Sequence, residues 1–294
     1  MITENRINEL ANYKIRVTSN KLPQSNPLLP SFFYSALFCG ATGSGKTFKL
    51  VELIMLYKKY GIFYFDKNKL EMRICLFCST ANSNANKVYN LLKIAEEDII
   101  LKYSDEMLEE KLKEVMEEQK YIKEWNLHIK AFKKFHENDD IEVMTDEELI
   151  LLNKYGMEEK DDIKRKNEKI YFFIFDDLLG TDAFKIWAKS KLNNLVTLCR
   201  HHNINLFFTS QYLKAIPPII RTNVKVWCVF KFANSNLILD HIYPELSAIV
   251  KEENFIQAYE HATDDDHDCL TVILGNMDKK YRIRKYWNTY LQYN

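Results

Sequence analysis

The sequence lacks any long hydrophobic run and contains few cysteines. Its densest apolar segment, residues 170–179, is interrupted by Asp176 and Asp177, so no stretch approaches the ~20 apolar residues that a transmembrane helix needs. The first residues, MITENRINEL, lack the charged-then-apolar layout of a signal peptide. Six cysteines in 294 residues do not indicate the disulfide framework of a secreted protein. We therefore expect no transmembrane segment and a reducing compartment.

Net charge is also absent, because 41 basic and 41 acidic side chains cancel. Their distribution is uneven: residues 93–168 hold 23 acidic and 14 basic side chains, whereas the rest of the chain holds 18 and 27. A polyanion-binding surface on that remainder is compatible with these counts, but zero overall charge is not by itself an argument for nucleic acid. The hydrophobic fraction of 47% is that of a globular protein with a substantial core.

Proline is missing between Pro30 and Pro217, which favours a body of helices and core strands. Earlier prolines mark residues 1–30 as an N-terminal arm, and residues 31–294 as the main domain. Apolar runs predict buried strands, and spacings of three and four predict helices between them. The expected strands are 32–39, 73–79, 169–180, 205–211 and 224–232, and the expected helices are 47–60, about 182–199 and about 236–260. Alternation after residue 269 predicts a hairpin about Gly275-Asn276, so we expect an α/β fold with a mainly parallel sheet and an antiparallel C-terminal edge.

A charged insertion at about 85–168 differs from the rest of the chain. It contains one glycine and no proline, and its apolar residues between Leu108 and Phe132 recur at steps of three, four or seven. This spacing predicts an amphipathic helix that packs on another part of the protein. Two interpretations stay open: an insertion with a solvated charged face, or a surface that binds a partner or a neighbouring subunit.

Glycine is scarce, yet three of the seven glycines lie within six positions and are followed by a lysine and a threonine. The segment fits the phosphate-binding pattern G-x-x-x-x-G-K-[ST] and comprises Gly40, Ala41, Thr42, Gly43, Ser44, Gly45, Lys46 and Thr47. Glycines let the backbone N–H groups turn around a phosphate, and the following helix adds its positive N-terminal end. Lys46 is expected to contact the β- and γ-phosphates and Thr47 to join a Mg²⁺ shell. The loop therefore predicts that a nucleoside triphosphate binds here with Mg²⁺.

Two carboxylates end the apolar strand IYFFIFDD. Charges in such a place are costly unless a cation or water needs them there. We expect Asp176 to be the metal-side acid and Asp177 to orient or deprotonate the attacking water. The alternative for Asp177 is a cap on the next helix.

Other polar residues follow or precede the neighbouring strands. Gln211 ends the segment NLFFTSQ and is a candidate for sensing the γ-phosphate. The alternative is that it belongs to a plain turn at the end of the strand. Phosphoryl transfer needs a cation to stabilise the developing charge, and a neighbouring subunit often supplies it. Arg200 and Arg221 are candidates for this role, with ordinary surface residues as the alternative. The pair after Arg200, two adjacent histidines, has no third ligand at metal spacing and favours a polar role at a helix end.

Two further patterns allow two interpretations each. Cys75 and Cys78 form a C-x-x-C inside a predicted buried strand, with no second pair at zinc-finger spacing. They favour buried thiols over a metal or redox role. The basic and aromatic segment 279–287 is either a charged edge strand protected from aggregation or a DNA-phosphate contact.

Taken in order, GATGSGKT, YFFIFDD and CRHHNINLFFTSQYLKAIPPIIRTN resemble the genome-packaging ATPases of large DNA viruses, the poxvirus-type branch of the HerA/FtsK superfamily of P-loop motors. The third stretch is the most specific of these. The resemblance covers roughly residues 32–80 and 169–235, and the insertion contributes nothing to it. Asp177 stands where cellular relatives carry glutamate, which is one methylene longer.

The resemblance implies an ASCE-type, RecA-like sheet in which the NLFFTSQ strand lies between the loop strand and the FFIFDD strand. It also implies a homo-oligomeric ring, expected to be hexameric, that hydrolyses ATP and pumps double-stranded DNA into a capsid. The expected partners are DNA and capsid or portal-vertex proteins, in the virion or the host cytoplasm. By motif, Lys46 and Thr47 correspond to the phosphate and Mg²⁺ residues, Asp176 to the metal acid, Asp177 to the catalytic acid, Gln211 to the sensor, and Arg200 and Arg221 to interface arginines.

Two other functions remain as alternatives. The first is a nucleotide-regulated assembly or scaffold protein of the virion without sustained ATP turnover; the acid pair and Gln211 count against it. The second is a small-molecule P-loop kinase, for which KYRIRKYW is the only lid candidate.

Overall fold

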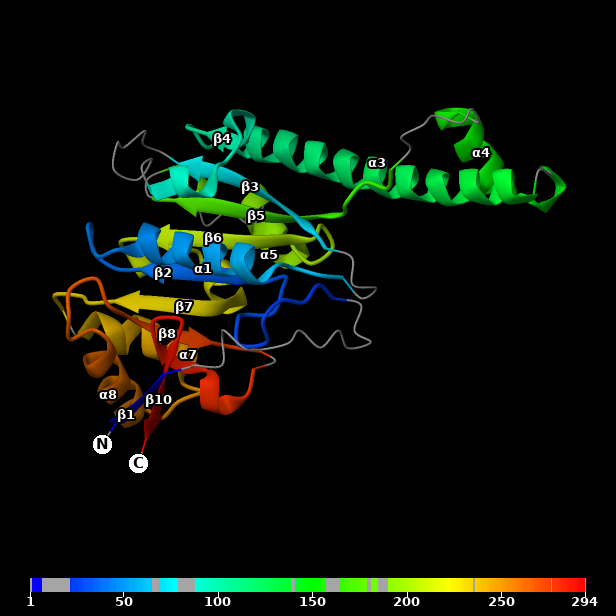
Figure 1. Cartoon of the computed structure of the whole chain (residues 1–294). Coiled ribbons are helices and arrows are strands. Elements are labelled where there is room, and N and C mark those ends of the chain that lie inside the picture. Colours follow the sequence, from blue (N-terminus) through cyan, green and yellow to red (C-terminus); the bar gives the residue numbers. More distant parts are fainter. Residues whose placement is uncertain are drawn as a thin grey trace.

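A ten-stranded sheet with helices on both faces forms the body of the protein in the computed structural model (Figure 1). The structure describes residues 2–6, 22–64, 69–78, 88–138, 141–156, 164–178, 181–184, 190–234, 236–275 and 277–293. Everything below concerns these residues.

The sheet divides into a parallel core and an antiparallel side. In spatial order the parallel strands are β7 (Val224–Phe230), β2 (Ser35–Cys39), β6 (Ile204–Ser210), β5 (Lys169–Asp176), β3 (Glu71–Cys78) and β4 (Ile99–Ile100). Next to β7 follow the antiparallel strands β8 (Cys269–Ile273), β9 (Ile283–Lys285), β10 (Thr289–Tyr293) and β1 (Ile2–Arg6). The predicted mainly parallel α/β sheet with an antiparallel C-terminal edge is confirmed.

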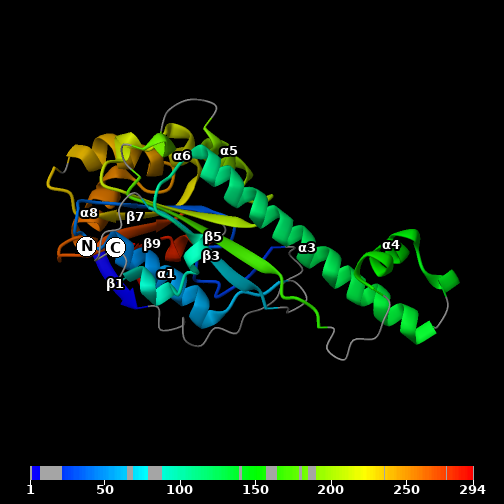
Figure 2. The same ribbon diagram turned by 90° about the horizontal axis from the view of Figure 1, so that it is seen from above.

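Helices cover the two faces of the sheet unequally (Figure 2). On one face lies α1 (Lys46–Tyr60), and on the other lie α5 (Lys191–Leu198), α6 (Pro218–Asn223), α7 (Tyr243–Leu246) and α8 (Glu252–Ala262). Alternate residues of one strand serve the two cores: Phe38 packs with the apolar face of α1, whereas Leu37 and Cys39 pack with the helices opposite. Burial on both faces explains why the central strands are continuous apolar runs.

Short helical turns connect these elements. The 3₁₀ turns are Asn90–Leu92, Glu96–Asp98, Ile141–Val143, Asp182–Phe184, Leu213–Ala215 and Lys279–Tyr281, and a π-helical turn spans Ile238–Ile242. The helix expected at about 182–199 is therefore shorter than predicted: it is described as a 3₁₀ turn and α5, and residues 185–189 lie outside the described residues.

The amphipathic helix expected in the insertion is confirmed as α3 (Asp105–Asn138), which at 1.5 Å per residue is about 50 Å long. Its first half buries Leu108 and Val115 against the sheet, and its second half extends past the sheet beside α4 (Asp146–Tyr155) (Figure 1). A capping box at Thr145 starts α4. A small separate core holds this helical projection together, formed by Ala131, Phe132, Met144 and Leu152.

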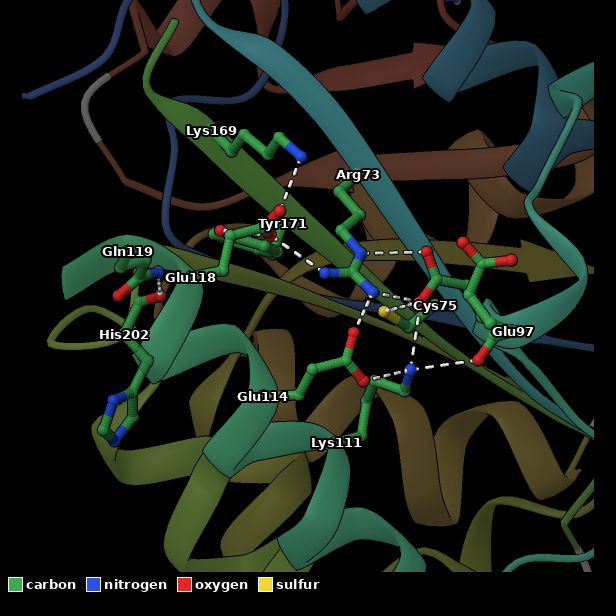
Figure 3. A network of polar contacts seen from close by, with 11 residues as sticks. Arg73, Cys75, Glu97, Lys111, Glu114, Glu118, Gln119, Lys169, Tyr171 and His202 are labelled. Atoms are coloured by element: carbon green, nitrogen blue, oxygen red, sulfur yellow. Dashed lines mark hydrogen bonds and ion pairs between the residues drawn. The ribbon is translucent and has the colours of Figure 1, made fainter. Parts of the chain in front are cut away.

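A charged network attaches the first half of α3 to the sheet (Figure 3). Arg73 of β3 donates to both oxygens of Asp98, at 2.9 and 2.8 Å, to Glu118 at 2.9 Å and to Glu114. Lys111 reaches the same acids, with Nζ 3.1 Å from Asp98 and 2.6 Å from Glu114. Three residues of α3 and one of β3 thus share their charges around a single buried carboxylate.

The N-terminal residues hold an element that the sequence patterns do not predict. Residues 2–6, expected to belong to an arm, form the outer strand β1, which pairs antiparallel with β10. The pairing joins the two ends of the chain, so no local sequence pattern reveals it. Later in the same segment, Leu28 and Leu29 are buried in the core beside α1.

The two cysteines of the C-x-x-C pattern point to opposite sides of β3. Cys75 belongs to the core beneath α3 and α5, whereas Cys78 belongs to the core beneath α1. Both thiols are buried, and burial raises the pKa of each. Because residues three apart on a strand face opposite ways, these two cannot share a metal ion, which favours the buried-thiol interpretation.

Candidate nucleotide-binding site

The glycine loop begins where β2 ends, at the carboxyl edge of the parallel strands. The Gly40 N–H donates to the Ser210 carbonyl at 3.1 Å, which ties the loop to the end of β6. A Cβ at Gly40 would lie 2.5 Å from Phe230 Cβ, so no larger residue fits there. Gly45 precedes α1 with φ +95°, a conformation that favours glycine. The predicted order of strand, loop and helix is therefore formed, and glycine is required at position 40 by the nearby Phe230 and favoured at position 45 by the positive φ.

Lys46 folds over the loop toward the acid strand. Its ammonium donates to the carbonyls of Gly40 and Ala41, at 2.9 and 2.7 Å. Burial lowers the pKa of Lys46, and the charges of Asp177 and Asp176 oppose this shift. The lysine therefore lies within electrostatic range of both predicted acids, although they are 130 residues away in the sequence.

A threonine on the strand between the loop and the acids contacts the carboxylate of Asp176 and the backbone of Asp177. The Thr209 hydroxyl donates to Asp176 Oδ1 at 2.6 Å and accepts from the backbone N–H of Asp177 at 3.0 Å. Asp177 has φ +49°, an uncommon conformation for a residue with a side chain. Such strain is concentrated at functional sites, where the surrounding contacts hold it in place.

Asp176 is a buried acid with incomplete compensation. Only 7% of its surface is exposed, and burial raises its pKa, with the charge of Asp177 adding to the shift. The hydroxyls of Thr209 and Tyr89 and the charge of Lys46 act in the opposite direction without cancelling it. A buried carboxylate in this state is stabilised by an additional cation, so the donor set fits Mg²⁺.

Gln211 links the phosphate loop to the second acid. The Thr42 hydroxyl donates to Gln211 Oε1 at 2.8 Å, and Gln211 Nε2 donates to the two oxygens of Asp177 at 3.1 and 3.0 Å. Loop, glutamine and acid thus form one hydrogen-bonded chain. The contact with Gln211 gives Asp177 a partner across the site.

Two buried hydroxyls of the cradle have no hydrogen-bond partner among the described residues. Ser44 Oγ belongs to the loop itself. Tyr89 Oη lies near enough to Asp176 and Thr47 to interact with them electrostatically, but makes no hydrogen bond of normal geometry. Buried polar atoms without partners are rare and costly. Their position beside Gly40–Thr47 fits a polyphosphate with its cation.

The two arginines lie elsewhere in this chain. Arg200 is exposed in the turn before β6, and Arg221 belongs to α6 just before β7. Both therefore lie at the amino edge of the parallel strands, a strand length or about 20 Å from the loop. Arg221 Nε is 3.6 Å from Glu245 Oε1. Neither reaches this chain's own loop, so their role in charge stabilisation stays a prediction that requires a neighbouring subunit.

Thr209 and Tyr89 are site residues that belong to none of the sequence motifs. A signal for Thr209 exists, since it carries a hydroxyl inside a strand whose other side chains before Ser210 are mostly apolar. Tyr89 offers none, because it lies between two described strands in the chain without any motif around it.

The basic segment 279–287 is largely engaged within the protein. Its strand β9 lies between β8 and β10, so the expectation of an edge strand is wrong. Arg284 is fully buried and donates to the carbonyls of Tyr281 and Trp287, and burial lowers its pKa to about 10. Lys285 pairs with Asp264 at 3.0 Å. These contacts make the strand part of the fold and leave fewer of its charges for DNA.

A phosphate loop and an acid-terminated strand separated by one further strand define an ASCE-type P-loop nucleoside triphosphatase. The strand order β2-β6-β5 is the order expected for that class. The family model described as Poxvirus A32 protein matches residues 65–276, which is more than half of the chain, and the chain belongs to this family. The match begins after the phosphate loop and includes Asp176, Asp177 and Gln211.

Solved structures of similar shape include three kinds of ATP-related protein. The genome packaging NTPase B204 from Sulfolobus turreted icosahedral virus 2, in complex with ATP-gammaS, is 13% identical, with 89% of this chain and 98% of that chain covered and a TM-score of 0.44. The pCW3 conjugation coupling protein TcpA is 15% identical (92% and 67% covered, TM-score 0.43). EssC from Geobacillus thermodenitrificans is 16% identical (86% and 39% covered, TM-score 0.44). Likeness at this level carries no argument about function.

A search of curated protein sequences found no match. Among the described residues, no helix is both long enough and apolar enough to cross a membrane.

Proposed function

We propose that this protein is an ATP-hydrolysing motor that moves double-stranded viral DNA into a capsid. Membership of the poxvirus A32 family supports this proposal, as does the resemblance of its motifs to genome-packaging ATPases. The observation that carries it is the hydrogen-bonded chain from Thr42 through Gln211 to Asp177. Binding alone does not need a carboxylate connected to the phosphate loop, whereas hydrolysis needs a positioned group that orients or deprotonates the attacking water.

Each residue of the site has a role in this proposal. The loop N–H groups and Lys46 bind the phosphates, and Thr47 and Asp176 would hold Mg²⁺. When bound, Mg²⁺ neutralises charge on the phosphate oxygens. Asp177 orients and deprotonates the attacking water, and Gln211 fixes the direction of that carboxylate. Because Gln211 also contacts Thr42, it is placed to respond to a change at the terminal phosphate.

The proposal extends to the assembly. We infer a homo-oligomeric ring, with six subunits as the expected number, in which an arginine such as Arg200 or Arg221 acts on a neighbouring site. A ring is favoured because neither arginine reaches its own chain's loop. Double-stranded DNA and capsid or portal-vertex proteins are the proposed partners, and the virion or the host cytoplasm is the proposed location.

The test is Mg²⁺-dependent ATP hydrolysis with and without double-stranded DNA. The wild type is expected to turn over ATP, and DNA to increase the rate. Lys46→Ala is expected to abolish turnover by removing the phosphate-binding charge, and the control Lys59→Ala, at the exposed end of the same helix, to leave it unchanged.

Asp177→Asn separates the motor from the alternative, an assembly protein that binds ATP without turning it over. For a motor, this variant should still bind ATP but lose at least ~100-fold in turnover, the usual contribution of a general base. The exposed Asp240→Asn is the matched control. Equal and negligible turnover in the wild type and Asp177→Asn, with DNA present and at high protein concentration, would contradict the motor and favour the assembly protein.

A further inference from the structure

A hollow of about 370 Å³ opens beside the phosphate loop at the start of α1. Its walls come from three separate parts of the chain: the loop and first turn of α1, the segment before β8, and the turn after β9. The residues used below are Gly45, Phe48, Lys49, His267 and Tyr286. Its volume is in the range of small-molecule sites.

The direction of the bound phosphates follows from the contacts of the loop. Gln211 contacts Thr42 and donates to Asp177. A terminal phosphate that reacts beside Asp177 therefore lies at the end of the loop that carries Thr42. The hollow is lined by Gly43 and Gly45 but by neither Ala41 nor Thr42. A second hollow, of about 460 Å³, is lined by residues 41–44, 230–233 and 266–268, and so includes Thr42, the residue that Gln211 contacts. The first hollow is therefore the one placed to receive the other end of a nucleotide.

Aromatic side chains dominate the chemistry of this hollow. Phe48 directly follows the predicted Mg²⁺ ligand Thr47 and is 56% exposed, although apolar residues of the same helix such as Leu50 and Ile54 are buried. Tyr286 lines the same hollow. Lys49 lies close to both rings, with Nζ 4.1 Å from the centroid of Tyr286 and 5.8 Å from that of Phe48. An exposed ring and a half-buried ring beside a cation suit a flat, electron-rich heterocycle.

The walls are held in place by buried contacts. Trp287, only 2% exposed, donates its indole N–H to the Lys49 carbonyl at 3.2 Å, which fixes the turn carrying Tyr286 against α1. On the other side His267 adopts φ +68° and packs beside the loop, since a Cβ at Gly45 would be in van der Waals contact with His267 Cβ, at 3.4 Å. The hollow is thus formed before a ligand enters, which reduces the entropy cost of binding.

We propose that this hollow binds the base of the nucleoside triphosphate, with Phe48 and Tyr286 as the stacking residues. The inference rests on the proposed function, because it takes the phosphate loop as the site of the triphosphate. Stacking depends on ring area more than on hydrogen-bond pattern, so the site should accept purines better than pyrimidines without a strict choice between adenine and guanine.

The test compares ATP with inorganic tripolyphosphate, which offers the loop the same phosphates but no base. Calorimetric titration with Mg²⁺ present should give Phe48→Ala about 10-fold weaker ATP binding, in line with the loss of one stacking contact, and unchanged tripolyphosphate binding. Phe48→Tyr keeps a ring and should bind ATP as the wild type does. Met55→Ala, which removes another exposed apolar side chain from α1, is the control and should change neither ligand.

Tyr286 provides a second, independent variant. Tyr286→Phe should keep ATP affinity and Tyr286→Ser should lower it, again without affecting tripolyphosphate. Unchanged ATP affinity in Phe48→Ala and Tyr286→Ser, or an equal loss for both ligands, would overturn the base site while leaving the phosphate loop intact. A wild type that binds tripolyphosphate and ATP equally well would do the same. A wild type that binds neither ligand would contradict the proposed function itself, and the base site with it.

Discussion

Two clusters of charge lie on the same sheet and differ in how they are compensated. In the network beneath α3, burial alone would raise the pKa of Asp98, but the hydrogen bonds and charges of Arg73 and Lys111 lower it. At the nucleotide site, burial raises the pKa of Asp176 and the nearby Lys46 does not reverse the shift. Both acids are almost completely buried. The difference lies in their partners.

The cations of the first cluster donate directly to its buried carboxylate, whereas the cation of the second, Lys46, donates to the carbonyls of Gly40 and Ala41 and acts on Asp176 through its charge. Arg73 gives Asp98 two hydrogen bonds and Lys111 gives a third, so the carboxylate is stabilised in its charged form (Figure 3). Asp176 receives one hydrogen bond from a neutral hydroxyl and stands beside a second acid. A compensated network attaches one part of a fold to another. A buried acid whose pKa stays raised despite its own partners indicates a place where a cation from solution binds.

The substitution Asp98→Asn tests this comparison with the largest expected effect on stability. The variant leaves Arg73 and Lys111 with an uncompensated share of buried positive charge, and we expect the free energy of unfolding to fall by about 3 kcal/mol. Urea unfolding followed by circular dichroism measures it. Asp240→Asn, at an exposed position, serves as the control. If Asp98→Asn unfolds at the same urea concentration as the wild type, the network does not attach α3.

Acid pH is expected to have the second largest effect. Because the pKa values of Asp98 and Glu118 are lowered in the folded state, their stabilisation is complete above the unfolded values near 4 and is lost as the pH falls through the folded values. The stability difference between the wild type and Asp98→Asn should therefore narrow below about pH 4. Thermal unfolding of both proteins between pH 7 and pH 2.5 measures it; a difference that stays constant over this range would contradict the assignment.

Much of the fold follows from local sequence patterns. Continuous apolar runs such as residues 169–176 predict central strands because both faces of a parallel sheet are covered. The spacing of the apolar residues from Leu108 to Phe132 predicts α3, because an amphipathic helix buries one face against the rest of the protein. What local patterns do not contain is pairing between distant segments. The strand β1 exists because β10 lies beside it, and the position of β9 inside the sheet depends on the same partner.

The nucleotide site was predictable where its chemistry has a motif. The loop from Gly40 to Thr47, the acids Asp176 and Asp177, and Gln211 come together because parallel strands end at one edge. Thr209 was not predictable in its role, since one hydroxyl within a strand gains meaning only when the neighbouring strand places a carboxylate beside it. The motif identified the two arginines but not their distance from the loop. They precede parallel strands, whereas the loop follows one, so they lie at the opposite edge of the sheet.

The smallest expected effect on stability, and the sharpest test of the comparison, comes from Asp176→Asn. The amide oxygen can still accept from Thr209, and the change removes a buried charge and its repulsion with Asp177. Since the folded pKa of Asp176 is raised, its ionised form lowers stability at neutral pH. Without nucleotide, the free energy of unfolding should therefore equal the wild-type value or exceed it by up to about 1 kcal/mol.

The same substitution should weaken the effect of Mg²⁺ on the unfolding temperature in the presence of ATP. In the wild type, a ligand that binds only the folded state raises the unfolding temperature, by an amount that grows with ligand concentration. Asp176→Asn lacks the charged oxygen that fits Mg²⁺, so its unfolding temperature should rise less when Mg²⁺ is added to ATP. Thermal unfolding with ATP alone and with ATP and Mg²⁺ gives both numbers. A loss of stability as large as that of Asp98→Asn would mean that Asp176 is already compensated within the chain, and that the two clusters do not differ in the way their contacts indicate.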